Sequence, residues 1–246
     1  MSVKARIVLS ADPAAAAAEM LATAAAAGGH MALAGGSTPR AAYERAGGAG
    51  VDWSGATLWF GDERCVAPDH EQSNFGMVKQ ALLDRIEGAP PDVRRIEGER
   101  PPREAASQYE HALREAFGGG EPVLDLALMG LGPDGHTASL FPRDAALGAD
   151  GPLAVAVDRP GMAPIIPRVT LTLRVLNAAR EVVFLATGAD KAGAARRAFA
   201  RQGNPDTPAS LVRPRHGSLT ALLDADAAAE LPTGAQDASR TPGEVA

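Results

Sequence analysis

Residues 123–137, with the sequence VLDLALMGLGPDGHT, decide the fold, because a run of apolar residues passes directly into a turn of glycines and polar side chains. Its segment 126–130, LALMG, is continuously apolar, which is typical of a strand covered on both faces of a parallel sheet. The turn that follows carries Asp134 and His136. Because Asp134 and His136 directly follow the strand, we expect both side chains to lie at the edge of the sheet as candidate functional groups.

The same pattern occurs three more times along the chain. ALAG at 32–35 leads into Gly36, LWFG at 58–61 leads into Asp62, and FLATG at 184–188 leads into Ala189. The carboxyl ends of parallel strands meet at one edge of the sheet, which is where open α/β folds bind their ligands. The four turns are therefore predicted to converge on one site.

Helical patterns alternate with these strands. Alternation of this kind predicts an α/β fold in which a mostly parallel central sheet carries helices on both faces. We expect a single α/β domain over residues 1–231 and a C-terminal tail over 232–246, which has no core pattern. The expected elements are strands at 3–10, 30–35, 56–61, 123–130, 169–176 and 182–188, and helices at 13–27, 38–47, 73–86, 103–117 and near 190–201.

Composition limits the classes of protein that the chain can belong to. It has 246 residues, 46% of them hydrophobic and 22% charged, as in an ordinary globular protein. A formal net charge of -6 argues against a broad nucleic-acid surface. Cys65 is the only cysteine, so an intrachain disulfide and a cysteine-based zinc site are excluded. His, Asp and Glu show no metal-ligand spacing either, so we expect catalysis without a metal.

The sequence contains no apolar run long enough to cross a membrane. The N-terminal segment has a basic start and an alanine run, but Asp12 and Pro13 interrupt it as a helix cap and a first helical residue do. It is interpreted as a strand followed by a helix rather than a signal peptide. The expected location is the cytoplasm, without a membrane partner.

The turn at residues 35–39, GGSTP, suits an oxyanion. Glycines allow close approach of the backbone, the N–H groups at the start of the next helix favour negative charge, and Ser37 and Thr38 add hydroxyls. The alternative is a plain glycine turn in which Ser or Thr caps the helix and Pro39 takes its first position. Lys191 follows another of the strands and is one of three lysines in the chain. Its ammonium either binds a phosphate or is solvated on a helix.

His136 is the best candidate for catalysis. Histidine is the side chain most easily used as a general base near neutral pH, and Asp134 could fix the tautomer of its ring. The alternative is a capping or core histidine. Arg64 could stabilise an oxyanion and Asp62 could hold sugar hydroxyls, unless residues 62–64 form a surface cluster of ion pairs. Arg168 is either a second phosphate ligand or a charge at a strand edge.

Six motifs follow one another along the chain and cover about residues 5–230. They are AGGSTP (34–39), GDERCVAPDHEQSNFGM (61–77), MGLGPDGHTASLFP (129–142), PRVTLT (167–172), TGADK (187–191) and PAS (208–210). With these motifs the sequence resembles the 6-phosphogluconolactonase family, whose fold is shared with glucosamine-6-phosphate deaminase and ribose-5-phosphate isomerase. The resemblance implies hydrolysis of 6-phospho-D-glucono-1,5-lactone to 6-phospho-D-gluconate, the second step of the oxidative pentose phosphate pathway, without a cofactor.

Residue by residue, the resemblance implies roles for the candidate groups. His136 matches the general base, Asp62 and Arg64 match an element beside the sugar, and Lys191 and Arg168 match cationic partners of the phosphate. The phosphate itself would lie near Gly36, Ser37 and Thr38. The sequence departs from the family's pattern at 65–68, CVAP, which puts the local loop shape in doubt.

Two other functions remain open at this point. A glucosamine-6-phosphate deaminase resembles the chain through the same turns, but it has a glutamate soon after the histidine, where residues 137–142 here are TASLFP. A sugar-phosphate sensor without catalysis is the other alternative, and the sequence shows no N-terminal extension that would hold a DNA-binding motif. The expected partner is a phosphorylated sugar lactone, and the expected state is a monomer or a weak homo-oligomer.

Overall fold

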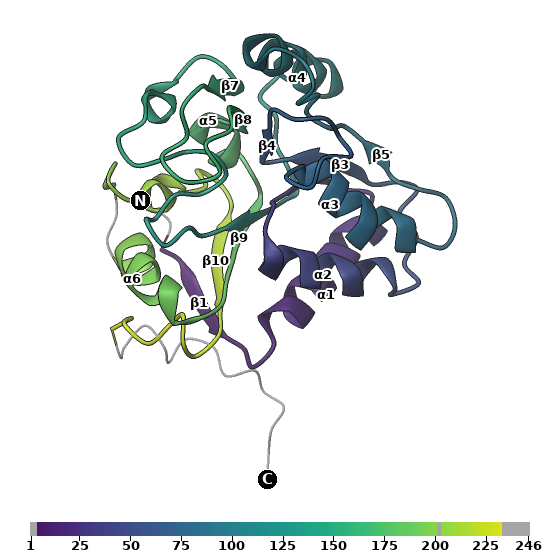
Figure 1. Cartoon of the computed structure of the whole chain (residues 1–246). Helices are drawn as coiled ribbons and strands as arrows, with labels where there is room; N and C mark the ends of the chain where they lie inside the picture. The colour runs from purple at the N-terminus through teal and green to yellow at the C-terminus, as the bar shows by residue number, and fades with distance from the viewer. Residues whose placement is uncertain (1–3, 201–202, 233–246) are drawn as a thin grey trace.

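The computed structural model describes residues 4–200 and 203–232 of the chain. Within them, a seven-stranded sheet has the order β1-β10-β9-β6-β2-β3-β5, and every neighbouring pair is parallel (Figure 1). This confirms the mostly parallel sheet. Its strands are β1 (Arg6–Leu9), β2 (His30–Leu33), β3 (Thr57–Phe60), β5 (Asp92–Val93), β6 (Leu126–Gly130), β9 (Glu181–Ala186) and β10 (Ser218–Leu223).

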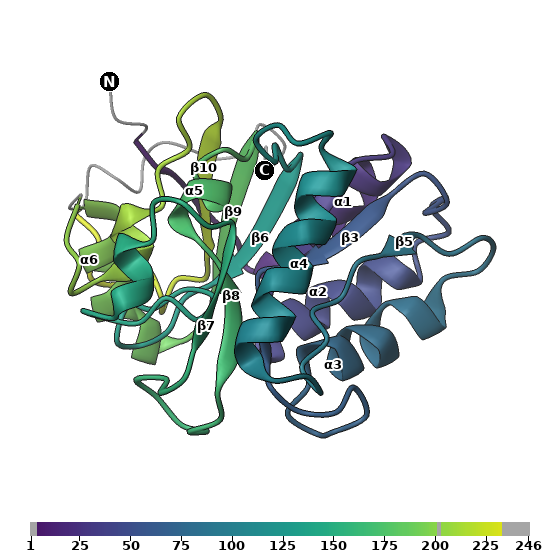
Figure 2. The ribbon, with the colours of Figure 1, turned by 90° about the horizontal axis from the view of Figure 1, so that it is seen from above.

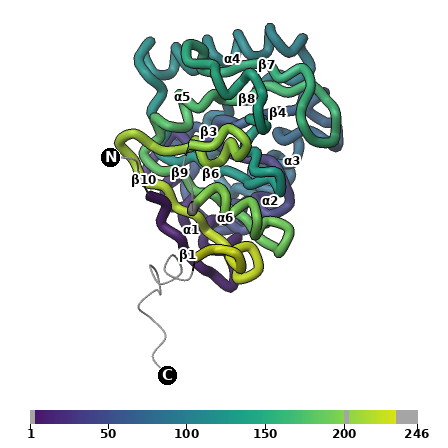
Figure 3. The backbone as a smooth tube through the Cα atoms, turned by 90° about the vertical axis from the view of Figure 1, so that its left-hand side faces the viewer, coloured from purple at the N-terminus to yellow at the C-terminus, as the bar shows by residue number. Residues whose placement is uncertain are grey.

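Helices cover both faces of this sheet, as expected. Figures 1 and 3 both place α4 on one side of the sheet and α1 on the other. Seen from above, α4 lies across the sheet between β6 and β5 (Figure 2). The α-helices are α1 (Pro13–Ala26), α2 (Ser37–Gly47), α3 (Asn74–Ala81), α4 (Pro102–Ala116), α5 (Leu173–Leu176) and α6 (Ala192–Ala200). Short 3₁₀ helices occupy Leu83–Arg85, Ala145–Gly148, Ala189–Lys191 and Pro208–Leu211.

Local sequence explains how α1 connects β1 to β2. Asp12 caps α1 by accepting a hydrogen bond from the Ala15 backbone N–H at 3.1 Å, and Pro13 is the first helical residue. Gly28, with φ of 70°, then allows the chain to leave the helix and enter β2. β2, β3, β6 and β9 are buried almost throughout, as strands covered on both faces must be.

A second sheet was not predicted. β4 (Asp62–Arg64), β8 (Arg168–Leu171) and β7 (Ala154–Val157) form a three-stranded antiparallel sheet. It extends from the end of β3 and lies with α4 on the same side of the main sheet (Figures 1 and 3). Its middle strand β8 carries Arg168, so this small sheet brings a distant cation beside Asp62 and Arg64.

The expected strands need correction. The strand expected at 169–176 ends at Leu171, because the Thr172 carbonyl accepts hydrogen bonds from Val175 and Leu176 and so starts α5. The short edge strand β5 and the strand β10 were not predicted. The predicted tail at 232–246 lies outside the described residues from 233 onward, and a single domain over 1–231 stays a prediction.

The strand order places a ligand site. From β2 the chain moves outward to β3 and β5, then returns to β6 on the other side of β2 and continues to β9 and β10. The order therefore reverses between β2 and β6. The turns that follow these two strands separate there, and open α/β sheets bind ligands in the crevice that results.

Candidate active site

A cavity of about 250 Å³ lies at the carboxyl ends of the central strands. All four predicted turns contribute to it: Gly36 follows β2, Asp62 and Arg64 follow β3, His136 follows β6 and Lys191 follows β9. Arg168 enters from β8. The predicted convergence is therefore present, and an anion-binding group and an imidazole line one cavity.

The turn after β2 presents the N-terminus of α2 to the cavity. Gly36 is the N-cap, with φ of 110°, and makes no side-chain capping bond. The alternative in which Ser or Thr caps this helix is therefore wrong. Ser37 and Thr38 lie outside the lining of the cavity, and the Thr38 hydroxyl bonds instead to that of Thr187 at 3.0 Å. Backbone N–H groups, rather than hydroxyls, are what this turn offers to an anion.

His136 is oriented by Asp134. Asp134 Oδ1 lies 2.6 Å from the ring Nδ1 of His136 and accepts the His136 backbone N–H at 3.0 Å. Burial raises the pKa of the Asp134 carboxyl, but its hydrogen bonds with His136 outweigh burial and lower that pKa overall. An ionised carboxylate carries no hydrogen, so Nδ1 must donate to it. In the neutral ring the lone pair is then on Nε2.

Gly132 makes the His136–Asp134 pair possible. A Cβ atom at Gly132 would lie 2.0 Å from His136 Nδ1 and 2.7 Å from Asp134 Oδ1, closer than any real Cβ contact. The turn therefore needs glycine at this position for a steric reason. Gly132 therefore serves to let two side chains approach each other.

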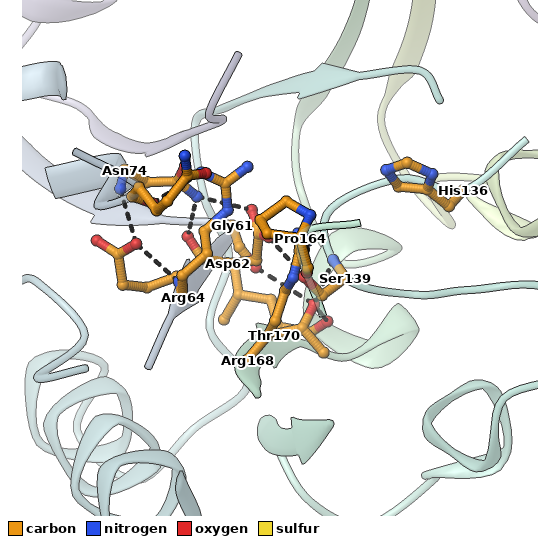
Figure 4. Close-up of polar contacts among 12 residues, drawn as sticks. Gly61, Asp62, Arg64, Asn74, His136, Ser139, Pro164, Arg168 and Thr170 are labelled. Atoms are coloured by element: carbon orange, nitrogen blue, oxygen red, sulfur yellow. Dashed lines mark hydrogen bonds and ion pairs between the residues drawn. The ribbon is translucent and has the colours of Figure 1, made fainter. Parts of the chain in front are cut away.

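Two guanidinium groups line the opposite part of the cavity (Figure 4). Arg168 is 4% exposed, and burial lowers its pKa while the neighbouring Asp62 opposes that shift. Its Nη1 lies 3.9 Å from Asp62 Oδ2, and its Nη2 donates to the Pro164 carbonyl at 3.2 Å. The Nε atoms of Arg64 and Arg168 are buried without a hydrogen-bond partner among the described residues. These donors make this wall of the cavity suitable for an anion.

Asp62 is surrounded by protein donors. Ser139 Oγ donates to its Oδ2 at 2.6 Å, and Asn74 Nδ2 donates to its Oδ1 at 3.2 Å. With Arg168 beside the same carboxylate, little of it is left to face a ligand, and its side chain is 7% exposed. Gly35 accommodates this arrangement, because a Cβ there would lie 2.0 Å from Asn74 Oδ1.

Sequence reasoning missed Ser139 and Asn74. Both lie inside quoted motifs, but their partner Asp62 is 77 and 12 positions away, so no local pattern links them. The available signal was the Ser73-Asn74 pair at the start of a helix. Ser73 does cap α3, and Asn74 is its first residue.

Glu63 has a structural place beside these groups. Its carboxylate accepts the backbone N–H groups of Asn74 and Phe75, each at 2.7 Å, at the start of α3. Burial raises its pKa, against the effect of those backbone donors. Asp62 and Glu63 are both buried, so residues 62–64 are not a surface cluster of ion pairs.

Lys191 ends the 3₁₀ helix after β9 and lines the cavity. Its Nζ lies 2.9 Å from the exposed Asp190 carboxylate, and 23% of its side chain is accessible. Over residues 4–200 and 203–232, no three His, Cys, Asp or Glu side chains are grouped so that they could hold a metal ion. No helix in the same part of the chain is long and apolar enough to cross a membrane.

Comparison with known proteins gives matches over most of the chain. Residues 6–221 match the model of the family described as glucosamine-6-phosphate isomerases/6-phosphogluconolactonase. The human 6-phosphogluconolactonase is 45% identical over 179 residues, which are 72% of this chain and 68% of that protein. The Synechocystis 6-phosphogluconolactonase is 38% identical over 208 residues, 82% of this chain and 85% of that protein.

A solved structure extends the similarity to the fold. The 6-phosphogluconolactonase from Trypanosoma brucei superimposes with a TM-score of 0.80 at 29% identity and covers 94% of this chain and 100% of that one. The matched segment contains all four turns that line the cavity. The chain belongs to the family of glucosamine-6-phosphate isomerases and 6-phosphogluconolactonases.

Proposed function

We propose that the protein hydrolyses 6-phospho-D-glucono-1,5-lactone to 6-phospho-D-gluconate. Relatives with 37–45% identity carry the name 6-phosphogluconolactonase, and the cavity has the groups that this reaction needs. The observation that carries the proposal is that one cavity is lined both by His136, whose ring is held by Asp134, and by Arg64, Arg168 and Lys191.

The phosphate of the substrate binds at the cationic side of the cavity. The uncapped N-terminus of α2 at Gly36 offers backbone N–H groups, and Lys191 and Arg168 supply positive charge. Arg168 suits this role because it is buried and its Nε has no other partner. Binding the phosphate there fixes the lactone ring with its carbonyl toward His136.

His136 then activates water. Its Nε2 takes one proton from a water molecule while the water oxygen forms a bond to lactone C1, and the carbonyl oxygen becomes an oxyanion. Arg64 or neighbouring backbone N–H groups stabilise that oxyanion. The C1–ring oxygen bond breaks as the carbonyl re-forms, and the imidazolium returns its proton to the departing ring oxygen. Asp134 holds the ring throughout and stabilises its cationic form.

Asp62 orients Arg168 and need not contact the sugar. Its carboxylate is already engaged by Ser139 and Asn74 and lies 3.9 Å from the Arg168 guanidinium. Asp62 is also the one carboxylate among the described residues that line the cavity. Aldose–ketose isomerisation moves protons at several atoms, whereas lactone hydrolysis needs one base and one oxyanion partner. A cavity with one histidine, several cations and one carboxylate that protein groups already engage therefore favours the lactonase reaction over the deaminase reaction.

A direct assay tests the proposal. Freshly made 6-phosphogluconolactone is followed with and without the protein, and the spontaneous rate is subtracted. His136→Ala should lower kcat about 100- to 10,000-fold, as loss of a general base does, without a change in unfolding. His111→Ala, an exposed histidine on α4, is the matched control and should leave kcat unchanged. A His136→Ala enzyme with wild-type kcat would remove His136 from the base role.

A further inference from the structure

Phe141 contacts two lining groups of different chemistry, the His136 imidazole and the Arg168 guanidinium. Its ring centroid is 4.9 Å from that of His136, with an interplanar angle of 35°, and the Arg168 Cζ lies 5.6 Å from the same centroid. Phe141 is 2% exposed and also lines the cavity. One aromatic side chain therefore contacts both the imidazole and a buried guanidinium.

The His136 ring needs this second contact. The hydrogen bond to Asp134 fixes the position of Nδ1, but one bond alone leaves the plane of the ring free to turn about it. The Phe141 ring, tilted against the imidazole, restricts that rotation, since aromatic rings prefer a limited set of offset and tilted geometries. Together the two contacts determine where Nε2 points.

The Phe141 ring is itself held in place. Gly161 packs against it, because a Cβ there would lie 3.3 Å from Phe141 Cβ and Cδ1. The Arg168 guanidinium, bonded to the Pro164 carbonyl, lies over the ring and is attracted by its π-electrons. The Phe141 ring thus has little room to move, so it can restrict the orientation of the side chains that contact it.

We propose that Phe141 is a positioning residue that sets the orientation of the His136 imidazole relative to the Arg168 guanidinium. Its ring contacts both the imidazole and one of the cations of the cavity, which Lys191, Arg64 and Asp62 also line. This inference rests on the proposed use of His136 as the base. It adds that an apolar side chain, which touches no reacting atom, controls the efficiency of that base.

Phe141→Leu tests this role by removing the aromatic face while keeping an apolar side chain, and Phe141→Met serves as a second variant. We expect kcat to fall about tenfold or more, since a small misplacement of a catalytic group has an effect of that size, and KM to rise by a smaller factor. Ring nitrogens of ¹⁵N-labelled His136 are observed by NMR in the resting enzyme. The wild type should show one sharp set of ring signals, and the variants should show signals broadened or doubled by exchange between ring orientations.

Phe199→Leu is the matched control, because Phe199 makes an edge-to-face contact with Phe184 between α6 and β9, with ring centroids 5.4 Å apart, and does not line the cavity. It should lower stability without changing kcat or the His136 signals, which His136→Ala identifies. Phe141 variants that keep kcat within about twofold, or that lose kcat with unchanged His136 ring signals, overturn the inference. An active His136→Ala enzyme would instead overturn the proposed function, so the two failures are distinguishable.

Discussion

At the scale of single residues, the site depends on pairs of side chains that fix each other. His136 is useful as a base because Asp134 occupies Nδ1, and Arg168 is available to an anion because Asp62 holds it without reaching its Nε. In each pair, one side chain is the proposed base or anion-binding group, and the other orients it. Loss of the orienting partner should therefore reduce activity while the chemical group remains present.

Asp134→Asn tests this dependence. The amide can present an N–H to Nδ1, which favours the tautomer with hydrogen on Nε2 and removes the lone pair that accepts the proton. We expect kcat to fall at least about tenfold, by analogy with the loss of an orienting aspartate in other His–Asp pairs. Steady-state kinetics at neutral pH measure this, and binding of the product 6-phosphogluconate should change little. Full activity would mean that Asp134 does not set the tautomer.

At the scale of elements, the two tyrosines of the chain hold the ends of two strands. The Tyr43 hydroxyl accepts the Ala34 N–H at 2.9 Å and donates to the Ala34 carbonyl at 2.8 Å, just beyond β2. The Tyr109 hydroxyl makes the same pair of bonds with Phe60, at the end of β3. Burial raises the pKa of both hydroxyls, so they stay protonated and able to donate. They satisfy backbone groups where two neighbouring strands lead into the site.

Tyr43→Phe should lower the free energy of unfolding by about 1–3 kcal/mol, because it leaves the buried Ala34 backbone groups without partners. Chemical denaturation measures the change. Tyr109→Phe is the matched comparison and should cost a similar amount. Since Ala34 lines the cavity and Phe60 does not, only Tyr43→Phe should also raise KM. Unchanged stability in both variants would show that the hydroxyls contribute nothing.

At the scale of the whole molecule, an anionic protein carries a cationic cavity. The chain has a net charge of -6, yet Arg64, Arg168 and Lys191 line the cavity against the single carboxylate of Asp62. A local positive potential is enough to attract an anionic substrate, even when the net charge of the protein is negative. The placement of cations, rather than their number, therefore determines which ligand the protein attracts.

Salt should weaken substrate binding for this reason. Raising the ionic strength shortens the distance over which charges interact, to about 8 Å at 0.15 M, so KM for the phosphorylated lactone should rise while kcat stays nearly constant. Glucono-1,5-lactone without the phosphate is the control, and its KM should respond much less. An equal response of the two substrates to salt would contradict the phosphate site.

Much of this arrangement follows from the sequence. Continuous apolar runs that end in glycine turns determined the parallel sheet, the edge at which the four turns meet and the identity of His136, Arg64 and Lys191 as lining residues. These features are local, because the run, the turn and the polar group are adjacent in the chain. Reliance on local pattern also explains why the strand predicted at 169–176 was wrong beyond Leu171. The pattern there is apolar, but Thr172 starts a helix.

Only the tertiary structure decided how the site is assembled. Three features join segments whose spacing carries no periodic signal: the antiparallel sheet that carries Arg168 to Asp62, the engagement of Asp62 by Ser139 and Asn74, and the tilted ring contact of Phe141 with His136. Such contacts depend on where whole elements pack, and that is set by burial of the entire core rather than by neighbours in the chain. The sequence by itself therefore determined which groups reach the edge of the sheet, and packing determined which of them are free to act.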